Sequence, residues 1–243
     1  MSVVHRLGDG LVNFYLVDTG DGLVLVDAGL PGHWRGFLAD LDRLGVAPTD
    51  VTDVLVTHGH PDHVGLAERL RVEAGARIHV HEAEAALVAA PLRPAADSRP
   101  EKSIVGYALR RPSGLRTPLH LLRQGALRTR PVLEPVTFTG GVLDDVPGRP
   151  LAVHTPGHTH GSTVFVFAEQ AFTGDALVTR EEMLGRVGPT LMCRAFSNDG
   201  AAALASLRAL EAHDVRDVHP GHGDPWTGGL PAAVREAVAA GVR

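Results

Sequence analysis

The sequence of 243 residues has a single cysteine, Cys193, which excludes an intrachain disulfide framework and a thiolate-rich zinc site. No apolar run reaches the roughly 20 residues that a membrane-spanning helix needs. The first ten residues, MSVVHRLGDG, contain neither the charged nor the apolar region of a signal peptide. We therefore expect a protein of the reducing cytoplasm that makes no contact with a membrane.

Aromatic residues and positive charge are also scarce. Seven Phe, two Tyr and two Trp leave the core to be built mainly from Val, Leu and Ala. The formal net charge of −5 argues against a protein that binds nucleic acid through its global charge. The length supports a sizeable core, and no linker divides the chain, so we expect residues 1–243 to form one domain.

Strand-like and helix-like patterns alternate along the chain. In the first half, the expected strands are residues 11–17, 23–27, 54–57 and 78–80, and the expected helices are 31–45, 61–74 and 82–90. In the second half, the expected strands are 136–138, 151–153, 163–167, 171–173 and 215–218, with helices at 200–212 and from about 230. This alternation predicts an α/β fold.

Residues 91–131 interrupt the alternation. The segment has six prolines, nine basic residues and only two acidic ones, so it carries a charge of +7 while the rest of the chain carries −12. A short helix is expected at 119–127. We interpret the segment as an insertion that either covers the functional site or forms an interface in a homo-oligomer.

Histidine is abundant, with 14 residues, and several lie beside aspartate in short segments that follow apolar strands. These segments are His58-Gly59-His60-Pro61-Asp62-His63, Pro156-Gly157-His158-Thr159, Gly174-Asp175 and Pro220-Gly221-His222-Gly223. Residues at strand ends gather at one edge of an α/β fold. Because neutral imidazoles and carboxylates suit zinc and related metals, the segments predict a metal site.

The first of these segments can serve two ions. Side chains two residues apart in extended backbone point the same way, so His58 and His60 can bind one ion, with Gly59 leaving room between them. Asp62 and His63 begin the next helix, face a different direction and can bind a second ion. Four such groups within six residues would bring no packing benefit unless a metal held them.

The segment from His58 to His63 resembles the HxHxDH signature of the hydrolases with the metallo-β-lactamase fold. The three later segments occur in that family's order, and Leu23–Asp27 with Ala28-Gly29 resembles the family's opening strand. The resemblance extends from about Val12 to Trp226. It implies an αββα sandwich, with the basic, proline-rich segment 91–131 as an insertion.

The resemblance also implies roles for individual residues. The first ion would be bound by His58, His60 and His158, and the second by Asp62, His63 and His222. Asp175 would bridge the two ions, and Asp27 would support the ligands from behind. We expect the same supporting role for His160, close to His158 in the sequence, although the family often has proline at this position. The expected cofactors are two divalent ions, zinc in the first place and iron or manganese as alternatives.

Two such cations lower the pKa of a shared water to around 7, so that a bridging hydroxide can attack an activated carbonyl. The expected substrates are thioesters, lactones or other esters, and β-lactams, and Asp62 is the expected catalytic residue because it can orient the hydroxide or transfer a proton. Two other functions stay open: an iron-dependent oxidoreductase similar to persulfide dioxygenases, and a phosphodiesterase or nuclease.

Three residues of the basic segment are expected to contact the substrate. Tyr107 can donate a hydrogen bond to a developing oxyanion, and Arg110 and Arg111 can bind a carboxylate or phosphate group through their planar guanidinium groups. These residues predict a small anionic molecule as the substrate.

Overall fold

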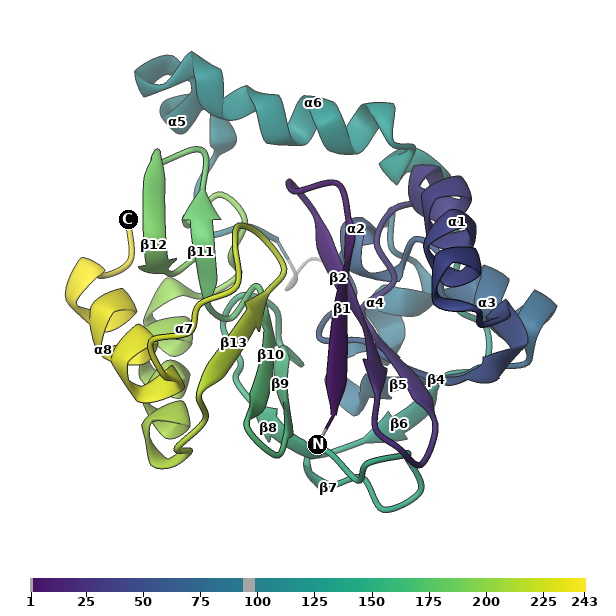
Figure 1. Cartoon of the computed structure of the whole chain (residues 1–243). Helices are drawn as coiled ribbons and strands as arrows, with labels where there is room; N and C mark the ends of the chain where they lie inside the picture. The colour runs from purple at the N-terminus through teal and green to yellow at the C-terminus, as the bar shows by residue number, and fades with distance from the viewer. Residues whose placement is uncertain (1, 94–98) are drawn as a thin grey trace.

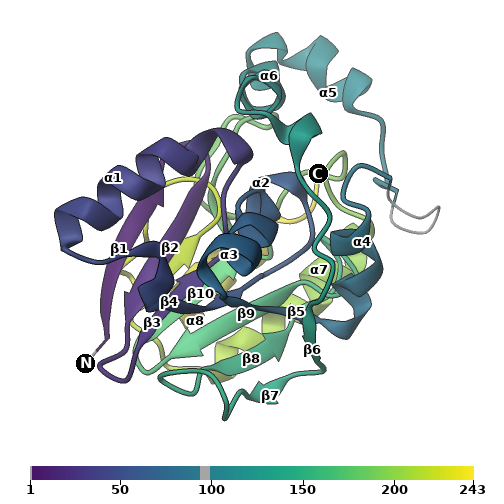
Figure 2. The same ribbon diagram turned by 90° about the vertical axis from the view of Figure 1, so that its right-hand side faces the viewer.

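Two β-sheets lie face to face in the centre of the protein, and helices cover the outer face of each sheet (Figure 1). The view turned by 90° shows the same layers from the side (Figure 2). The computed structural model describes residues 2–93 and 99–243. This arrangement confirms the αββα sandwich that the sequence motifs imply.

The first sheet has six strands in the order of the chain: β1 (Val3–Gly8), β2 (Asn13–Asp18), β3 (Leu23–Val26), β4 (Val51–Leu55), β5 (Arg77–His81) and β6 (Val136–Phe138). The second sheet has five strands, ordered β13 (Asp217–Pro220), β10 (Gln170–Gly174), β9 (Thr163–Phe167), β8 (Leu151–His154) and β7 (Gly141–Val142). A small separate sheet pairs β11 (Val178–Glu181) with β12 (Arg186–Thr190).

Eight α-helices are found in the described part of the chain. They are α1 (Trp34–Leu44), α2 (Pro61–Val64), α3 (Ala67–Ala74), α4 (Ala85–Ala89), α5 (Ile104–Arg110), α6 (Arg116–Arg123), α7 (Gly200–Leu207) and α8 (Leu230–Ala240). Short 3-10 helices occupy 31–33, 48–50, 82–84, 112–115, 126–128 and 208–212. Among the residues described, no helix has both the length and the apolar character that crossing a membrane requires.

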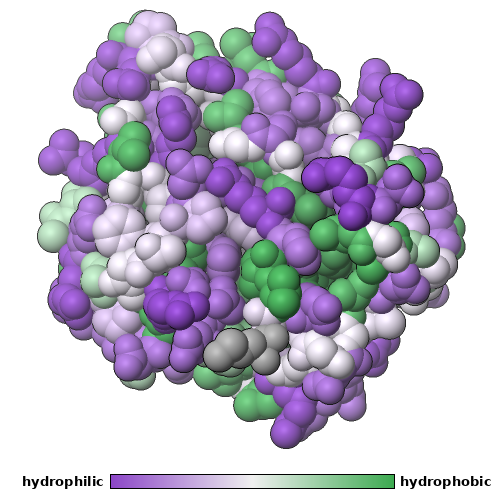
Figure 3. Space-filling model, in the orientation of Figure 1, coloured by the Kyte–Doolittle hydropathy of each residue, from purple (hydrophilic) through white to green (hydrophobic). Residues whose placement is uncertain are grey.

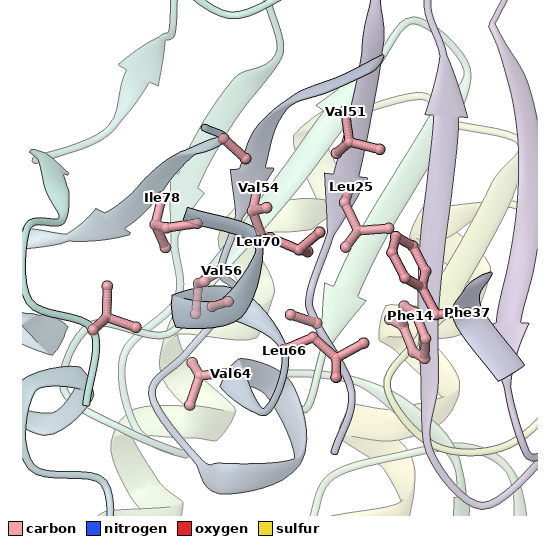
Figure 4. Packing of buried hydrophobic residues seen from close by; sticks show 14 of the residues in the cluster. Phe14, Leu25, Phe37, Val51, Val54, Val56, Val64, Leu66, Leu70 and Ile78 are labelled. Carbon is pink, nitrogen blue, oxygen red and sulfur yellow. The ribbon is translucent and has the colours of Figure 1, made fainter. Parts of the chain in front are cut away.

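Side chains alternate along β2 and β3, so the first sheet has one set on each face, and both sets are buried. Phe14 and Leu25 point toward the helices, where Phe37 of α1 and Leu70 of α3 pack on them (Figure 4). Their chain neighbours point the other way, to the second sheet, where the intersheet core contains Phe165 of β9. Because side chains alternate along a strand, two buried faces require a continuous apolar run, as the sequence of β2 provides.

The second sheet is covered in the same way by α7 and α8, through a core of small and branched side chains such as Leu207, Leu230 and Val234. On the face seen in Figure 3, hydrophilic side chains predominate, and apolar ones gather mainly near the middle.

The parallel strands bring their carboxyl ends to one edge of the sandwich. In the first sheet β3, β4, β5 and β6 run parallel, and in the second sheet β10 and β13 do so. The loops that follow these strands therefore meet at a single edge, and α5 and α6 of segment 91–131 pass over this edge at the top of Figure 1.

Several elements differ from the sequence prediction. The helix predicted over 61–74 is divided into α2 and α3, because Gly65 docks against the loop after β3: its N–H donates to the Gly29 carbonyl at 2.8 Å. A Cβ at Gly65 would lie 2.4 Å from that oxygen, so the break requires glycine. The strands β1, β7, β11 and β12 and the helix α5 were not predicted.

The packing between the two sheets should contribute strongly to the free energy of unfolding. Phe165 has no exposed surface and its ring meets that of Phe138 at a centroid distance of 5.8 Å. Phe165→Ala should lower the free energy of unfolding by about 3–5 kcal/mol, measured by denaturant titration. Val187→Ala on β12, where the side chain is 81% exposed, is the control and should change it by less than about 0.5 kcal/mol. Equal effects of the two substitutions would contradict this account of the core.

Candidate metal centre

Three imidazole nitrogens from two loops form a compact triangle. His58 and His60 follow β4, and His158 lies in the loop between β8 and β9. The Nε2 atom of His158 lies 3.1 Å from Nε2 of His58 and 3.0 Å from Nδ1 of His60, and the two latter atoms are 3.1 Å apart. Nitrogen ligands of a tetrahedral zinc ion are about 3.3 Å apart, so the triangle is close to the size that such an ion needs.

A second group of donors lies beside the first. Asp62 and His63 belong to α2, and His222 follows β13; one donor atom from each lies within 4.8 Å of the others. Asp175, in the loop after β10, lies between the two groups. Its Oδ2 atom is 3.6 Å from Nε2 of His158 and 3.3 Å from Nε2 of His222. The structure thus brings together all seven residues that the sequence motifs predicted as metal ligands.

The two groups of donors have different electrostatics. Burial lowers the pKa of His158 to about 3, and burial with neighbouring imidazoles keeps the pKa of His58 well below its usual range. These imidazoles are neutral and offer lone pairs. Burial alone would lower the pKa of His63 as well, but the carboxylates of Asp27, Asp175 and Asp62 outweigh it and raise this pKa to about 9.

Asp27 orients His63 from behind. Its Oδ2 atom accepts a hydrogen bond from Nδ1 of His63 at 2.7 Å, which leaves Nε2 of that imidazole directed at Asp175 and Asp62. The other carboxylate oxygen accepts the backbone N–H of Thr57 at 2.8 Å. Asp27 adopts a φ of 59°, an uncommon value for a residue other than glycine, and its hydrogen bonds hold this conformation.

Residues 7–222 match the family model described as the metallo-beta-lactamase superfamily. The chain belongs to this superfamily. It is 30% identical over 172 residues to the uncharacterized protein YobT of Bacillus subtilis (strain 168), an alignment that covers 70% of this chain and 63% of the relative. The chain therefore spans less than two thirds of that relative's length.

Two solved structures resemble this chain along most of its length. The metallo-beta-lactamase family protein TTHA1429 from Thermus thermophilus superposes with a TM-score of 0.70 and 25% identity, over 98% of this chain and 78% of the other. The protein TTHA1623, solved in a di-iron-bound form, superposes with a TM-score of 0.65 and 28% identity, over 95% and 96% of the two chains. These matches confirm the resemblance that the motifs carry.

A pocket of about 190 Å³ opens above the donor groups. Its floor consists of His60, Asp62, His158, Asp175 and His222. Segment 91–131 contributes Pro100, Thr117 and Leu121 to its sides. The loop after β12 contributes Met192, Ala195 and Phe196.

The structure does not bring the three predicted substrate contacts to this pocket. Tyr107, Arg110 and Arg111 line a separate depression together with Met183 and Arg243, among others. Helix α5, which carries Tyr107 and Arg110, packs on the cluster around Met183 and Cys193. Nε of Arg111, the residue after the helix, donates to the Glu182 carbonyl at 3.1 Å. His160 is exposed, and its carbonyl oxygen is 2.9 Å from Nε2 of His154.

Glu84 is a residue of the site that the sequence analysis missed. Its side chain is 1% exposed, and its carboxylate oxygens accept the N–H of Gly59 at 2.6 Å and of Gly161 at 2.7 Å. It therefore ties the loop of His58 and His60 to the loop of His158. Those glycines lie 25 and 77 residues away in the sequence, so no local pattern indicates the contact.

Removing one acceptor from Glu84 should loosen the histidine triangle. We expect Glu84→Gln to weaken binding of one of two metal ions and to lower the free energy of unfolding by about 1.5–3 kcal/mol, because a buried N–H loses its charged partner. Competition with a chelator and denaturant titration measure the two effects. The control is Glu82→Gln in the same 3-10 turn, where the side chain is exposed. Equal metal affinity in both variants would rule out the positioning role.

The hydrogen bond from His63 to Asp27 yields a second prediction. Asp27→Asn should weaken the second ion about 10- to 100-fold and the first ion less, since partners behind the ligands typically contribute this much and Asp27 bonds directly to His63. The matched control is Asp53→Asn, which removes another buried carboxylate that pairs with a histidine, His79, at 2.7 Å. Metal titration should find two sites of unchanged affinity in the control. An equal loss of affinity for both ions in Asp27→Asn would contradict the role of Asp27 behind His63.

Proposed function

We propose that the protein is a hydrolase with two divalent metal ions that cleaves an activated carbonyl compound in the cytoplasm. The substrates proposed are small thioesters, lactones or other esters, and β-lactams. The observation that carries the proposal is the position of Asp175 between a triangle of neutral imidazoles and a second group of three donors.

The donor set fits two cations. His63 Nε2 and Asp175 Oδ1 are buried, lie 3.5 Å apart and have no hydrogen-bond partner among the described residues. Unsatisfied polar atoms of this kind are rare and costly in native proteins, and a cation between them would satisfy both. We propose that His58, His60 and His158 hold one ion, that Asp62, His63 and His222 hold the other, and that Asp175 contacts both.

Asp62 is the residue we propose to act on the attacking water. When bound, the two ions would lower the pKa of a shared water and polarise the substrate carbonyl. The carboxylate of Asp62 lies on the floor of the pocket, and His63 and His222 outweigh the effect of burial and lower its pKa to about 2. It is therefore ionised at neutral pH and can accept a hydrogen bond that orients the water.

We propose zinc because imidazole and carboxylate donors suit it. One observation favours a second candidate, an iron-dependent oxidoreductase similar to persulfide dioxygenases: a relative at 28% identity was solved in a di-iron-bound form. A phosphodiesterase has no comparable support, since none of the described residues that line the pocket is Lys or Arg.

Metal removal tests the proposal. Chelation should abolish ester and thioester hydrolysis and lower the melting temperature, because ions that bind only the folded protein stabilise it. Re-addition of zinc should restore both. Metal analysis of the purified protein, with oxygen uptake on a persulfide, distinguishes the oxidoreductase. A chelated protein with unchanged hydrolysis and melting temperature would refute the metal centre.

Asp62→Asn should reduce turnover by about 10²- to 10⁴-fold, the usual contribution of a positioned acid–base group, while the shape of the side chain is kept. Turnover is compared at equal metal content, so that weaker binding of an ion is not mistaken for loss of catalysis. Asp42→Asn, an exposed change on α1, serves as the control. Full turnover in Asp62→Asn with both ions bound would exclude the catalytic role.

A further inference from the structure

The sides of the pocket above the donor groups are mainly apolar, in contrast to its floor, and Thr117 is the polar residue among those named above. Helix α6 presents Thr117 and Leu121, four residues apart and therefore on one face of the helix. Met192 and Phe196, from the loop after β12, line the same pocket. A substrate bound in this pocket therefore contacts these side chains as well as the donor groups.

The Lys and Arg side chains in the described part of segment 91–131 do not line this pocket. Arg116 and Arg123, at the two ends of α6, are exposed, and Arg110 and Arg111 line the separate depression beside α5. A smaller adjoining cleft contains Arg180, but Nε of this residue donates to Oε1 of Glu182 at 2.6 Å. No unpaired cationic side chain among the described residues lines the pocket to receive an anionic group.

The α6 wall is fixed to the first sheet. His120 and Gln124 contact the Asp9 carboxylate, and Gly32 donates its N–H to the Gln124 carbonyl at 2.8 Å. Asp9 also contacts Nε2 of His33 at 2.9 Å. Because Nδ1 of His33 accepts the N–H of Leu30, its Nε2 carries the hydrogen, and the cluster is a hydrogen-bonded anchor rather than a metal site.

We infer that this pocket selects an uncharged substrate with a short apolar chain beside its reacting carbonyl. The inference rests on the proposed function and names the substrate class: neutral esters, thioesters or lactones with an aliphatic acyl group, instead of the anionic molecule that the arginine-rich segment suggested. The acyl chain contacts Leu121 and Phe196 while the carbonyl meets the donor groups on the floor. An acyl chain that ends in a carboxylate would lose its hydration there without gaining a partner.

Esters that share the p-nitrophenolate leaving group and differ in their acyl groups test the selectivity of the pocket. The substrates are p-nitrophenyl acetate, butyrate and hemisuccinate. From the acetate to the butyrate, kcat/KM should rise about fourfold for each added methylene, the usual gain from burying such a group. The hemisuccinate should fall at least tenfold below the butyrate. Equal rates for acetate and butyrate, or a preference for the hemisuccinate, would overturn the inference and leave the hydrolase proposal standing.

Leu121→Ala should lower kcat/KM for the butyrate about tenfold and that for the acetate less than twofold, in the range typical of apolar pocket contacts. The matched control is Leu122→Ala on the same helix, where the side chain is 50% exposed and does not line the pocket. An equal loss for both esters in Leu121→Ala, or the same loss in the control, would contradict the placement of the acyl chain.

A binding experiment separates this inference from the proposed function. Calorimetry uses 2-butanone and 2-hexanone, which cannot be hydrolysed. The longer ketone should bind more tightly to the metal-loaded protein, and this difference in affinity should be lost in Leu121→Ala. This result without hydrolysis of any ester would support the pocket and refute the hydrolase. Equal affinity for both ketones, with esters hydrolysed, would refute the pocket alone.

Discussion

Two buried carboxylates, Asp27 and Glu84, accept backbone N–H groups from loops that are distant in the sequence, and the donor groups of the centre depend on these bonds. Asp27 joins the loop after β3 to Thr57 and His63. Glu84 joins the loop after β5 to Gly59 and Gly161. A buried N–H without an acceptor costs roughly 1–3 kcal/mol, so each loop has one strongly preferred position. The sandwich supplies the rigid strand ends from which these carboxylates act.

The elements that the sequence predicts well are those with local causes. Strand β9 has the predicted bounds, because five consecutive residues from Thr163 to Phe167 form an apolar, β-branched and aromatic run next to glycine and serine. The donor segments were located for a similar reason. Each follows a strand directly, and the parallel order of the strands carries the segments to one edge without further information.

The elements that the sequence does not predict depend on contacts between distant residues. Strand β12 contains Gly188 and Pro189, which argue against a strand, yet pairing with β11 and packing against α8 maintain it. The break after α2 depends on the approach of Gly65 to Gly29. The charge of segment 91–131 favours contact with an anionic ligand, but Pro100 and Leu121 are the apolar residues of its described part that line the pocket, whereas Arg110 and Arg111 line a separate depression.

The walls of the pocket and the donor groups on its floor belong to different elements. Leu121 lies on a helix that Asp9 and Gly32 anchor from outside the centre, whereas the donors are held at strand ends by Asp27 and Glu84. A change of side chain on α6 therefore disturbs none of the hydrogen bonds that hold the donors. In evolutionary terms, the donor groups and the walls of the pocket can vary independently, because a single substitution in α6 changes the shape of the pocket and leaves the donors in place.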